Sequence, residues 1–269
     1  MSALTFILKG EPPERLDLGM LTPEGLAGKS RAEIEKLLIG TTRHASRAGD
    51  VFKVSGRVGE AIIFEGGSER FDRAGAGMLR GSVRVTGDVG AQAGRQMRGG
   101  SLLIEGDAGP LAGSCMRGGR IEVSGNAGDG LGGPMAGELA GMNGGILIVR
   151  GKAGDRAADR MRRGLIAVGK SCGDHAGSRM IAGTLAVLGK AGAMPGCLMR
   201  RGTILLGRMP DELSPGFVET GAPDLAFASL LDRYLMQEGI TAKPLLDRAP
   251  RRFGGDNAVL GLGEILIAR

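Results

Sequence analysis

The sequence is poor in aromatic side chains and in metal-binding ones. Its 269 residues include no tryptophan, one tyrosine and seven phenylalanines, and His44 and His175 are the only histidines. The three cysteines, Cys115, Cys172 and Cys197, form no CxxC pair and no zinc-type spacing. We therefore expect no metal site and no bound cofactor in this chain. Sparse, unpaired cysteines also favour a reducing compartment, which predicts a cytoplasmic protein.

Long apolar stretches and export signals are missing as well. No apolar run approaches the roughly 20 residues that cross a bilayer, and the opening MSALTFILKGE lacks the charged start and long apolar core of a signal peptide. We therefore expect no membrane partner. Nucleic acid is not expected either, because single strands are bound on aromatic platforms and the repeats described next contain almost none.

Glycine is abundant, with 51 residues, and it recurs at a fixed distance from methionine. Seven of the thirteen methionines are spaced 19, 19, 26, 19, 19 and 19 residues apart, at Met78, Met97, Met116, Met142, Met161, Met180 and Met199. Each is followed three residues later by a glycine, at Gly81, Gly100, Gly119, Gly145, Gly164, Gly183 and Gly202. The single long gap predicts a seven-residue insertion, a loop within GDGLGGPMAGELAGM.

Each of these glycines precedes an alternating apolar pair, such as Ile166 with Val168, which predicts a strand with one buried face. A second glycine stands twelve residues after the methionine, at Gly90, Gly109, Gly128, Gly154, Gly173 and Gly192, and predicts a corner with positive φ or close backbone contact. A 19-residue unit cannot bury its own apolar face, so the units must stack. The pattern predicts a mostly β protein, a right-handed parallel β-helix of 19-residue coils. A left-handed one needs 18 residues per coil.

Two short segments flank the coils. Residues 1–49 are expected to form an N-terminal α/β cap, with LTFILKG as a strand and SRAEIEKLLI as a helix that starts at a capping box of Ser30 and Glu33. The β-helix is expected over residues 50–208. Its irregular first coils are DVFKVSG and EAIIFEGG, in which Ile62 and Phe64 take the places of a later apolar pair.

Residues 209–269 are expected to form a C-terminal helix and a closing strand. The helix, APDLAFASLLDRYLMQEG, places Leu231 and Leu235 on one face, with Leu230 and Tyr234 alongside, and stops at Gly239. The closing strand is GEILIAR. Such ends protect the edges of a solenoid from open pairing.

Positive charge is concentrated in the repeats, where residues 78–202 hold 17 basic and 9 acidic side chains. Many of these lie beside the methionine corner, as Arg80, Arg95, Arg98, Arg117, Arg160, Arg162, Arg163, Arg179, Arg200 and Arg201. Stacking predicts an edge lined with arginines, whose planar fork suits carboxylate or phosphate. This edge is a solvated face, a set of salt bridges to a partner subunit, or a site for an anionic cofactor tail. The candidate contact residues are Arg98, Arg117, Arg162, Arg163, Arg200 and Arg201.

Catalytic constellations are not found. Equivalent places after the strand hold Asp88, Asp107, Asn126, Lys152, Ser171 and Lys190, so we expect neither a carboxylate ladder nor a calcium ladder. Asp174 beside His175 is interpreted as a polar turn, and Cys172 and Cys197 as packing residues. No catalytic residue is predicted.

The stretch GLIAVGKS, Gly164 to Ser171, matches the nucleotide-binding pattern GxxxxGKS. A phosphate loop follows its strand and precedes a helix, whereas here Gly164 is a repeat corner and LIAV is the strand of a coil. The match therefore indicates no ATPase. AGKS at 27–30 also matches the end of this nucleotide-binding pattern by chance, because Ser30 is already the expected helix cap.

The glycine-bracketed coils resemble the GXGXG domain of the large glutamate synthase subunit, a right-handed β-helix that acts as a spacer. The ends, LTPEGLAGKSRAEIEKLLI at 21–39 and RRFGGDNAVLGLGEILI at 251–267, are similar to those of the C subunit of formylmethanofuran dehydrogenase. With the coils, this resemblance covers nearly the whole chain.

The resemblance implies a complex in which other subunits carry the chemistry and the C subunit is the scaffold. Expected partners are a metal-dependent amidohydrolase-type A subunit, a B subunit related to molybdopterin enzymes and a formyltransferase-type D subunit. Archaeal complexes reduce CO2 with tungsten or molybdenum. The similar complex of methylotrophic bacteria works in formaldehyde oxidation, and converts formyl-tetrahydromethanopterin to formate through a methanofuran analogue.

The chain has 27 arginines and only 8 lysines. Such a preference for arginine is typical of GC-rich bacteria and favours the formyltransferase/hydrolase complex. The alternatives are the C subunit of a tungsten or molybdenum dehydrogenase and a stand-alone β-helix enzyme. The resemblance carries over no catalytic residue, because the matching positions are glycines and strand residues.

Overall fold

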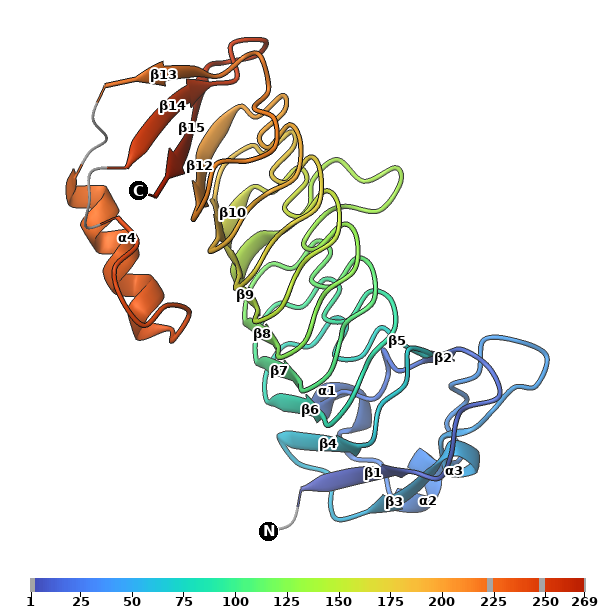
Figure 1. Cartoon of the computed structure of the whole chain (residues 1–269). Helices are drawn as coiled ribbons and strands as arrows, with labels where there is room; N and C mark the ends of the chain where they lie inside the picture. Colours follow the sequence, from blue (N-terminus) through green and yellow to red (C-terminus); the bar gives the residue numbers. More distant parts are fainter. Residues whose placement is uncertain (1–2, 222–224, 247–249, 269) are drawn as a thin grey trace.

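The computed structural model describes residues 3–221, 225–246 and 250–268. The described chain is mostly β, and one large, mostly parallel sheet of thirteen strands runs along it in the order β13-β14-β15-β12-β11-β10-β9-β8-β7-β6-β4-β1-β3 (Figure 1). The strands are β1 (Leu4–Leu8), β2 (Leu16–Asp17), β3 (Phe52–Ser55), β4 (Ala61–Glu65), β5 (Phe71–Asp72), β6 (Ser82–Val85), β7 (Ser101–Ile104), β8 (Arg120–Val123), β9 (Asn143–Val149), β10 (Arg163–Val168), β11 (Thr184–Val187), β12 (Arg201–Leu206), β13 (Val218–Thr220), β14 (Arg251–Gly255) and β15 (Leu262–Ile267). The helices are α1 (Pro23–Leu26), α2 (Arg31–Glu35), α3 (Ala48–Val51) and α4 (Leu225–Gln237).

Equivalent residues of successive repeats lie side by side from β6 to β12. Ile166 in β10, for example, pairs with Leu147 in β9 and Leu185 in β11, and all three side chains are buried. A second column of single parallel bridges joins Val89, Ala108, Ala127, Ala153, Cys172 and Ala191. Each 19-residue unit therefore contributes one strand and one bridge residue to a stack, and the 26-residue unit keeps the same register.

The methionine and the glycine of each repeat are packed against each other across the coils. All seven methionines are at most 1% exposed, and all seven following glycines have positive φ, from +75° at Gly81 to +108° at Gly202. A Cβ on Gly183 would lie 3.0 Å from Cε of Met161, one coil below. The methionine methyl thus occupies the space that the next coil's glycine leaves free, which explains the constant three-residue spacing.

The second glycine has a different role, because none of the six has positive φ. At Gly154, Gly173 and Gly192 an added Cβ would lie 2.0–2.1 Å from an aspartate Oδ1 of the coil below. Asp129 accepts the Asp155 amide at 2.9 Å and Asp155 accepts the Asp174 amide at 2.8 Å. These aspartates form a carboxylate ladder one residue after the second glycine, and Asp88 and Asp107 form a shorter one, because each accepts the amide of the next coil, at 2.7 and 2.6 Å. The expectation of no carboxylate ladder was wrong. Close contact, rather than positive φ, is what requires the second glycine.

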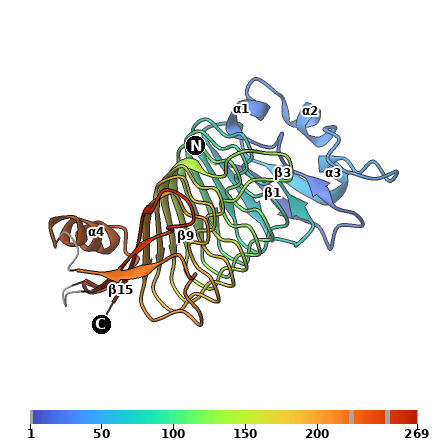
Figure 2. The same cartoon turned by 90° about the horizontal axis from the view of Figure 1, so that it is seen from above.

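The outer face of the sheet is open at one end and covered at the other. In β6, β7 and β8 every second residue is exposed or half-buried, as predicted for a strand with one buried face. In β10, β11 and β12 both faces are buried, because α4 packs across them (Figure 2). The apolar cluster beneath α4 joins Ala167, Ala186 and Leu205 of the strands to Leu231 and Leu235 of the helix.

Helix α4 agrees with the sequence prediction at its C-terminal end and differs from it at Leu230. Gly239 has φ of +63° and follows the helix, as expected for its stop. Tyr234 packs against the cluster beneath α4, but Leu230 is 60% exposed and does not belong to that cluster, so its predicted place beside that face was wrong. The predicted first residues of the helix, 222–224, lie outside the described residues.

The N-terminal segment is built into the main sheet rather than set apart from it. The predicted strand is β1, and it pairs in parallel with β4 and antiparallel with β3. Residues 50–56 therefore do not form a first coil, whereas Ile62 and Phe64 do pair with Val83 and Val85 as expected. Stacked phenylalanine rings fill this end, with Phe6 and Phe64 centred 5.0 Å apart.

Some of the helices and strands predicted for the two flanking segments agree with the structure, and others differ from it. The Ser30–Glu33 capping box is present, although α2 ends at Glu35 instead of running through residue 39. The predicted closing strand is β15, which pairs in parallel with β12 and continues the stack. Strands β13 and β14, which cover the end of the sheet in antiparallel register, were not predicted.

Candidate functional site

The stretch GLIAVGKS lies in the stack and forms no phosphate loop. Gly164 to Val168 belong to β10, and Ile166 and Val168 are fully buried in the core. No helix follows Ser171, since the chain continues into the bridge residue Cys172 and the next turn. The amides that would have to surround a phosphate are therefore held in parallel pairing.

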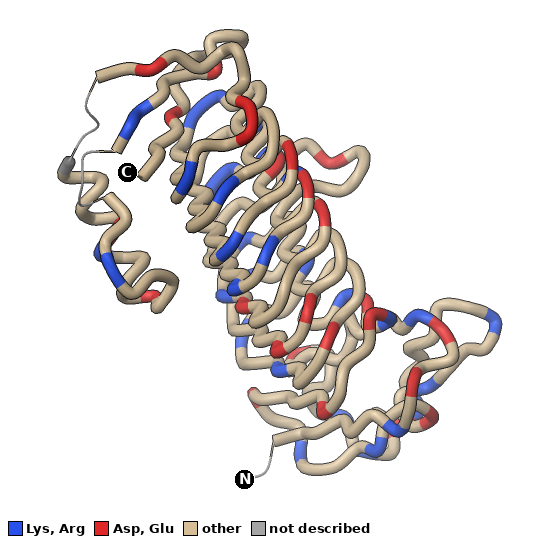
Figure 3. Tube along the Cα trace, viewed as in Figure 1, with Lys and Arg blue, Asp and Glu red and all other residues tan. Residues whose placement is uncertain are grey.

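Four of the six candidate arginines lie at the corner that follows each buried methionine, and the other two are the first residues of strands: the corner residues are Arg98, Arg117, Arg162 and Arg200, and Arg163 and Arg201 begin β10 and β12. All six are exposed, and within the described ranges no ion pair involves any of these guanidinium groups. Backbone bonds fix the row, because the amide of Arg98 donates to Met78 O and that of Arg117 donates to Met97 O, each at 2.8 Å. Figure 3 shows basic positions recurring from coil to coil beside the strands.

The row falls into two groups. Asn143 takes the corner position between Arg117 and Arg162, so Arg98 and Arg117 are set apart from the others. Arg162, Arg163 and Arg201 line one groove of about 460 Å³ together with Asn143, Ile181 and Ala182. Arg200 lies beside this groove without lining it. The structure thus brings three of the six predicted guanidinium groups together, in a groove whose lining residues include no acid.

Other arginines near the methionine corner form ion pairs or hydrogen bonds with groups of the same chain. Arg95 pairs with Glu138 at 2.5 Å, and Arg179 pairs with Asp159 at 2.6 Å. Arg160 donates to the backbone oxygen of Glu138 at 2.9 Å. These three therefore do not belong to the free arginine row.

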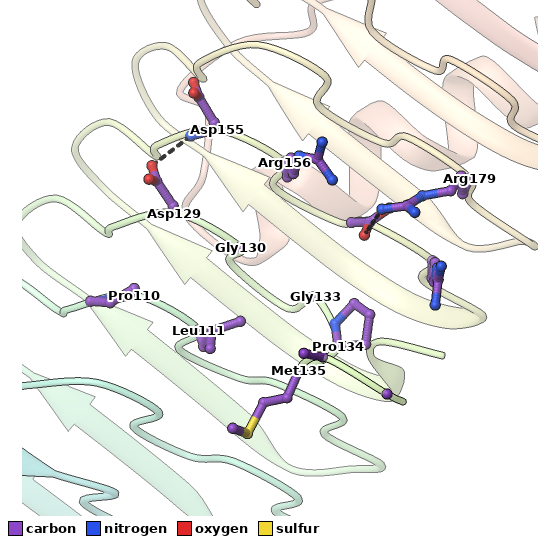
Figure 4. A pocket seen from close by; sticks show the side chains of 14 residues that line it. Pro110, Leu111, Asp129, Gly130, Gly133, Pro134, Met135, Asp155, Arg156 and Arg179 are labelled. Carbon is purple, nitrogen blue, oxygen red and sulfur yellow. Dashed lines mark hydrogen bonds and ion pairs between the residues drawn. The ribbon is translucent and has the colours of Figure 1, made fainter. Parts of the chain in front are cut away.

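The seven-residue insertion is a fixed loop. Glu138 accepts hydrogen bonds from Arg95, from the Cys115 thiol at 3.0 Å and from the Met135 amide at 2.8 Å. The loop forms one wall of a cavity of about 600 Å³, whose other wall carries Asp129, Asp155, Arg156 and Arg179 (Figure 4). Sequence reasoning placed the loop correctly but missed its anchor, because Arg95 and Glu138 are 43 residues apart and only the stacking brings them together.

Protonation of Glu138 should weaken this anchor. The Arg95 guanidinium above all, with the Cys115 thiol and the Met135 amide, lowers the pKa of Glu138 to about 2 from its ordinary 4.5. Because the folded pKa is the lower one, the contribution to stability is complete above pH 4.5 and is lost as the pH falls toward 2. We expect Glu138→Gln to cost about 1–2 kcal/mol at pH 7, allowing for the partial exposure of the carboxylate.

Urea unfolding of wild type and Glu138→Gln across about pH 2.5–7 measures this effect, and the difference between the two should shrink as the pH falls. Glu105→Gln, which removes an exposed ion pair to Arg84, is the control and should change stability by less than about 0.5 kcal/mol. A pH-independent gap between wild type and Glu138→Gln would contradict the assignment.

The remaining polar and thiol candidates are Asp174, Cys172 and Cys197. Asp174, next to His175, accepts the Ala193 amide at 2.8 Å and continues the carboxylate ladder, in agreement with a polar turn. Cys172 is buried, and burial raises the pKa of its thiol to about 12. Cys197 is half-buried. In the part of the chain that the structure describes, no group of three or more His, Cys, Asp or Glu side chains is arranged to hold a metal ion.

Among the described residues, no helix has the length and apolar character needed to span a bilayer.

Comparison with known proteins places the chain. No family model matches it. A curated protein of Methylorubrum extorquens, the C subunit of the formyltransferase/hydrolase complex Fhc, is 57% identical over 263 residues, which cover 98% of both chains. The chain belongs to the family of formyltransferase/hydrolase complex C subunits. Its glycine-rich coils and both of its ends are thus part of one family pattern.

A similar chain is also present among solved structures. A chain in the crystal structure of the formyltransferase/hydrolase complex from Methylorubrum extorquens, determined with methylofuran, superposes with a TM-score of 0.95 and 46% identity. The match covers 98% of this chain and 99% of that one. The fold of that chain is therefore shared over almost the full length of this one.

Proposed function

We propose that this chain is the scaffold subunit of a formyltransferase/hydrolase complex. The observation that carries the proposal is its 57% identity over 98% of its length to the C subunit of such a complex. The alternative of a dehydrogenase C subunit loses support, because both similar proteins belong to the formyltransferase/hydrolase complex. The partners are then the A, B and D subunits, and the compartment is the cytoplasm.

The chemistry of the complex is assigned to the other subunits. In this proposal the complex moves the formyl group from formyl-tetrahydromethanopterin to a methanofuran analogue and hydrolyses it to formate, in one-carbon metabolism that oxidises formaldehyde. The metal belongs to the A subunit, whereas this chain binds no cofactor and has no active site. The use of a methanofuran analogue is supported by the similar complex, which was solved with methylofuran.

A rigid stack suits a scaffold. We propose that the coils form a right-handed parallel β-helix over residues 50–208, with a cap at 1–49 and a closing segment at 209–269. Parallel pairing of equivalent residues supports this architecture. A solenoid resists bending because every coil is bonded to both neighbours, so partners that dock at different coils keep a fixed separation.

We assign the arginine row to contacts between the scaffold and other components of the complex. Arg98, Arg117, Arg162, Arg163, Arg200 and Arg201 are proposed to meet a partner subunit or the anionic tail of the carrier. Exposure and the lack of an acid partner within the described ranges support this role.

Turnover by the isolated chain tests the scaffold assignment against a stand-alone enzyme. We expect no release of formate from formyl-tetrahydromethanopterin, with or without a methanofuran analogue. The A, B and D subunits assembled with this chain provide the positive control. Formate release by the isolated chain would overturn the proposal.

A further inference from the structure

An apolar surface lies at the C-terminal end of the stack, next to the arginine groove. Leu198 is 43% exposed, Val259 39%, Leu260 57% and Leu262 66%. We name these four residues the end patch. Single exposed apolar residues are ordinary, but four exposed apolar side chains on two segments that are bonded to each other are typical of an interaction site.

The two segments of the end patch are joined through one buried carboxylate. Asp256 is 2% exposed, and its side chain accepts the Leu198 amide at 2.9 Å and the Ala258 amide at 2.8 Å. Its backbone oxygen accepts the amides of Val259 and Gly261 at 3.1 and 3.0 Å. The apolar side chains are therefore held out on a fixed turn, so little conformational entropy is lost when a partner binds them.

The end patch continues directly into the arginine groove. Leu262 pairs in parallel register with Arg201, so the two side chains leave the sheet on the same face. Arg201 also lines the groove with Arg162 and Arg163. The surface is thus apolar at one end, and at the other it carries three guanidinium groups without acid partners among the described residues.

We propose that the end patch and the arginine groove together bind one segment of another subunit of the complex. This inference rests on the proposed function. Charge complementarity defines the occupant, which is a protein surface with apolar side chains opposite Leu260 and Leu262 and carboxylates opposite Arg162, Arg163 and Arg201. An apolar centre bordered by charged groups is the usual anatomy of such an interface.

The test is isolation of the tagged chain co-expressed with the A, B and D subunits, followed by quantification of each co-isolated partner. Leu260→Asp should reduce retention of one partner about ten-fold or more, since a charge replaces a central apolar contact. Arg201→Glu should reduce retention of the same partner, by a factor that falls at high salt. Leu38→Asp changes a leucine that is 62% exposed at the opposite end, and it is expected to retain the full complement.

The outcomes separate this inference from the proposed function. If wild type assembles and Leu260→Asp assembles equally well, the docking surface is wrong and the scaffold role stands. If wild type isolates alone, both are wrong. Binding of the chain to anionic lipid vesicles that Leu260→Asp abolishes, with assembly unchanged, would assign the patch to a membrane and also overturn the inference. Thermal unfolding of each variant must match wild type, which is expected for exposed positions.

Discussion

Replacement of Gly164 by alanine is expected to lower the free energy of unfolding by about 3 kcal/mol or more. Gly164 has φ of +101°, a conformation that alanine rarely adopts. An added Cβ would also lie 2.6 Å from the Gly145 oxygen and 2.9 Å from Cε of Met142 in the coil below. Relief of this contact requires the coils to separate, which breaks the parallel pairing of β9 and β10.

Gly77→Ala is the matched control for this prediction. Gly77 also has positive φ, +71°, but an added Cβ there has no atom within 4 Å. Only backbone strain remains, so we expect a loss of about 1 kcal/mol. Urea unfolding followed by circular dichroism compares both variants with wild type. Equal losses would show that coil-to-coil contact is not what selects glycine at the repeat corner.

Met161→Ala is expected to cost about 2–5 kcal/mol, the range for truncation of a fully buried side chain. Met161 is 0% exposed and its methyl lies beneath Gly183 of the next coil. The coils are tied together by the sheet on one side and by bridges on the other, so they cannot close the cavity. Met209→Ala, at a methionine that is 41% exposed, is the control and should change stability by about 0.5 kcal/mol or less.

The methionine and glycine positions should be energetically coupled. In Gly183→Ala the new Cβ would meet Cε of Met161 at 3.0 Å and its sulfur at 3.3 Å. Removal of the methionine side chain removes both contacts. The cost of Gly183→Ala should therefore be smaller in the Met161→Ala background than in wild type, a deviation from additivity that a double-mutant cycle measures. Additive losses would contradict the interlocked packing.

The repeat could be predicted from the sequence because its signals are local and repeated. A buried methionine, a glycine with positive φ and an alternating apolar pair recur within about ten residues, so the copies reinforce one interpretation. The capping box of Ser30 and Glu33 was accessible for the same reason, since both partners lie within one turn of chain.

Features that depend on contacts between distant residues were missed. The ladder of Asp129, Asp155 and Asp174 occupies only some of the coils that carry the second glycine, so no full-length pattern marks it. Burial of both faces in β10, β11 and β12 depends on where α4 packs, which periodicity does not specify.

The arginine row illustrates the same limit at the candidate site. Sequence position predicts an edge of six arginines, and in the structure four of them follow a buried methionine while Arg163 and Arg201 begin β10 and β12. It does not predict that Arg95, Arg160 and Arg179 find partners inside the chain, or that Arg201 lies beside Leu262. Those relations follow from stacking and from the return of the chain as β15.

The most direct test of the scaffold assignment is quantitative isolation of the tagged chain from its native host, with the mass and stoichiometry of the isolated particle measured. We expect a hetero-oligomer that contains the A, B and D subunits in fixed ratio to this chain and releases formate from formyl-tetrahydromethanopterin. A monodisperse particle that contains this chain alone would contradict the assignment.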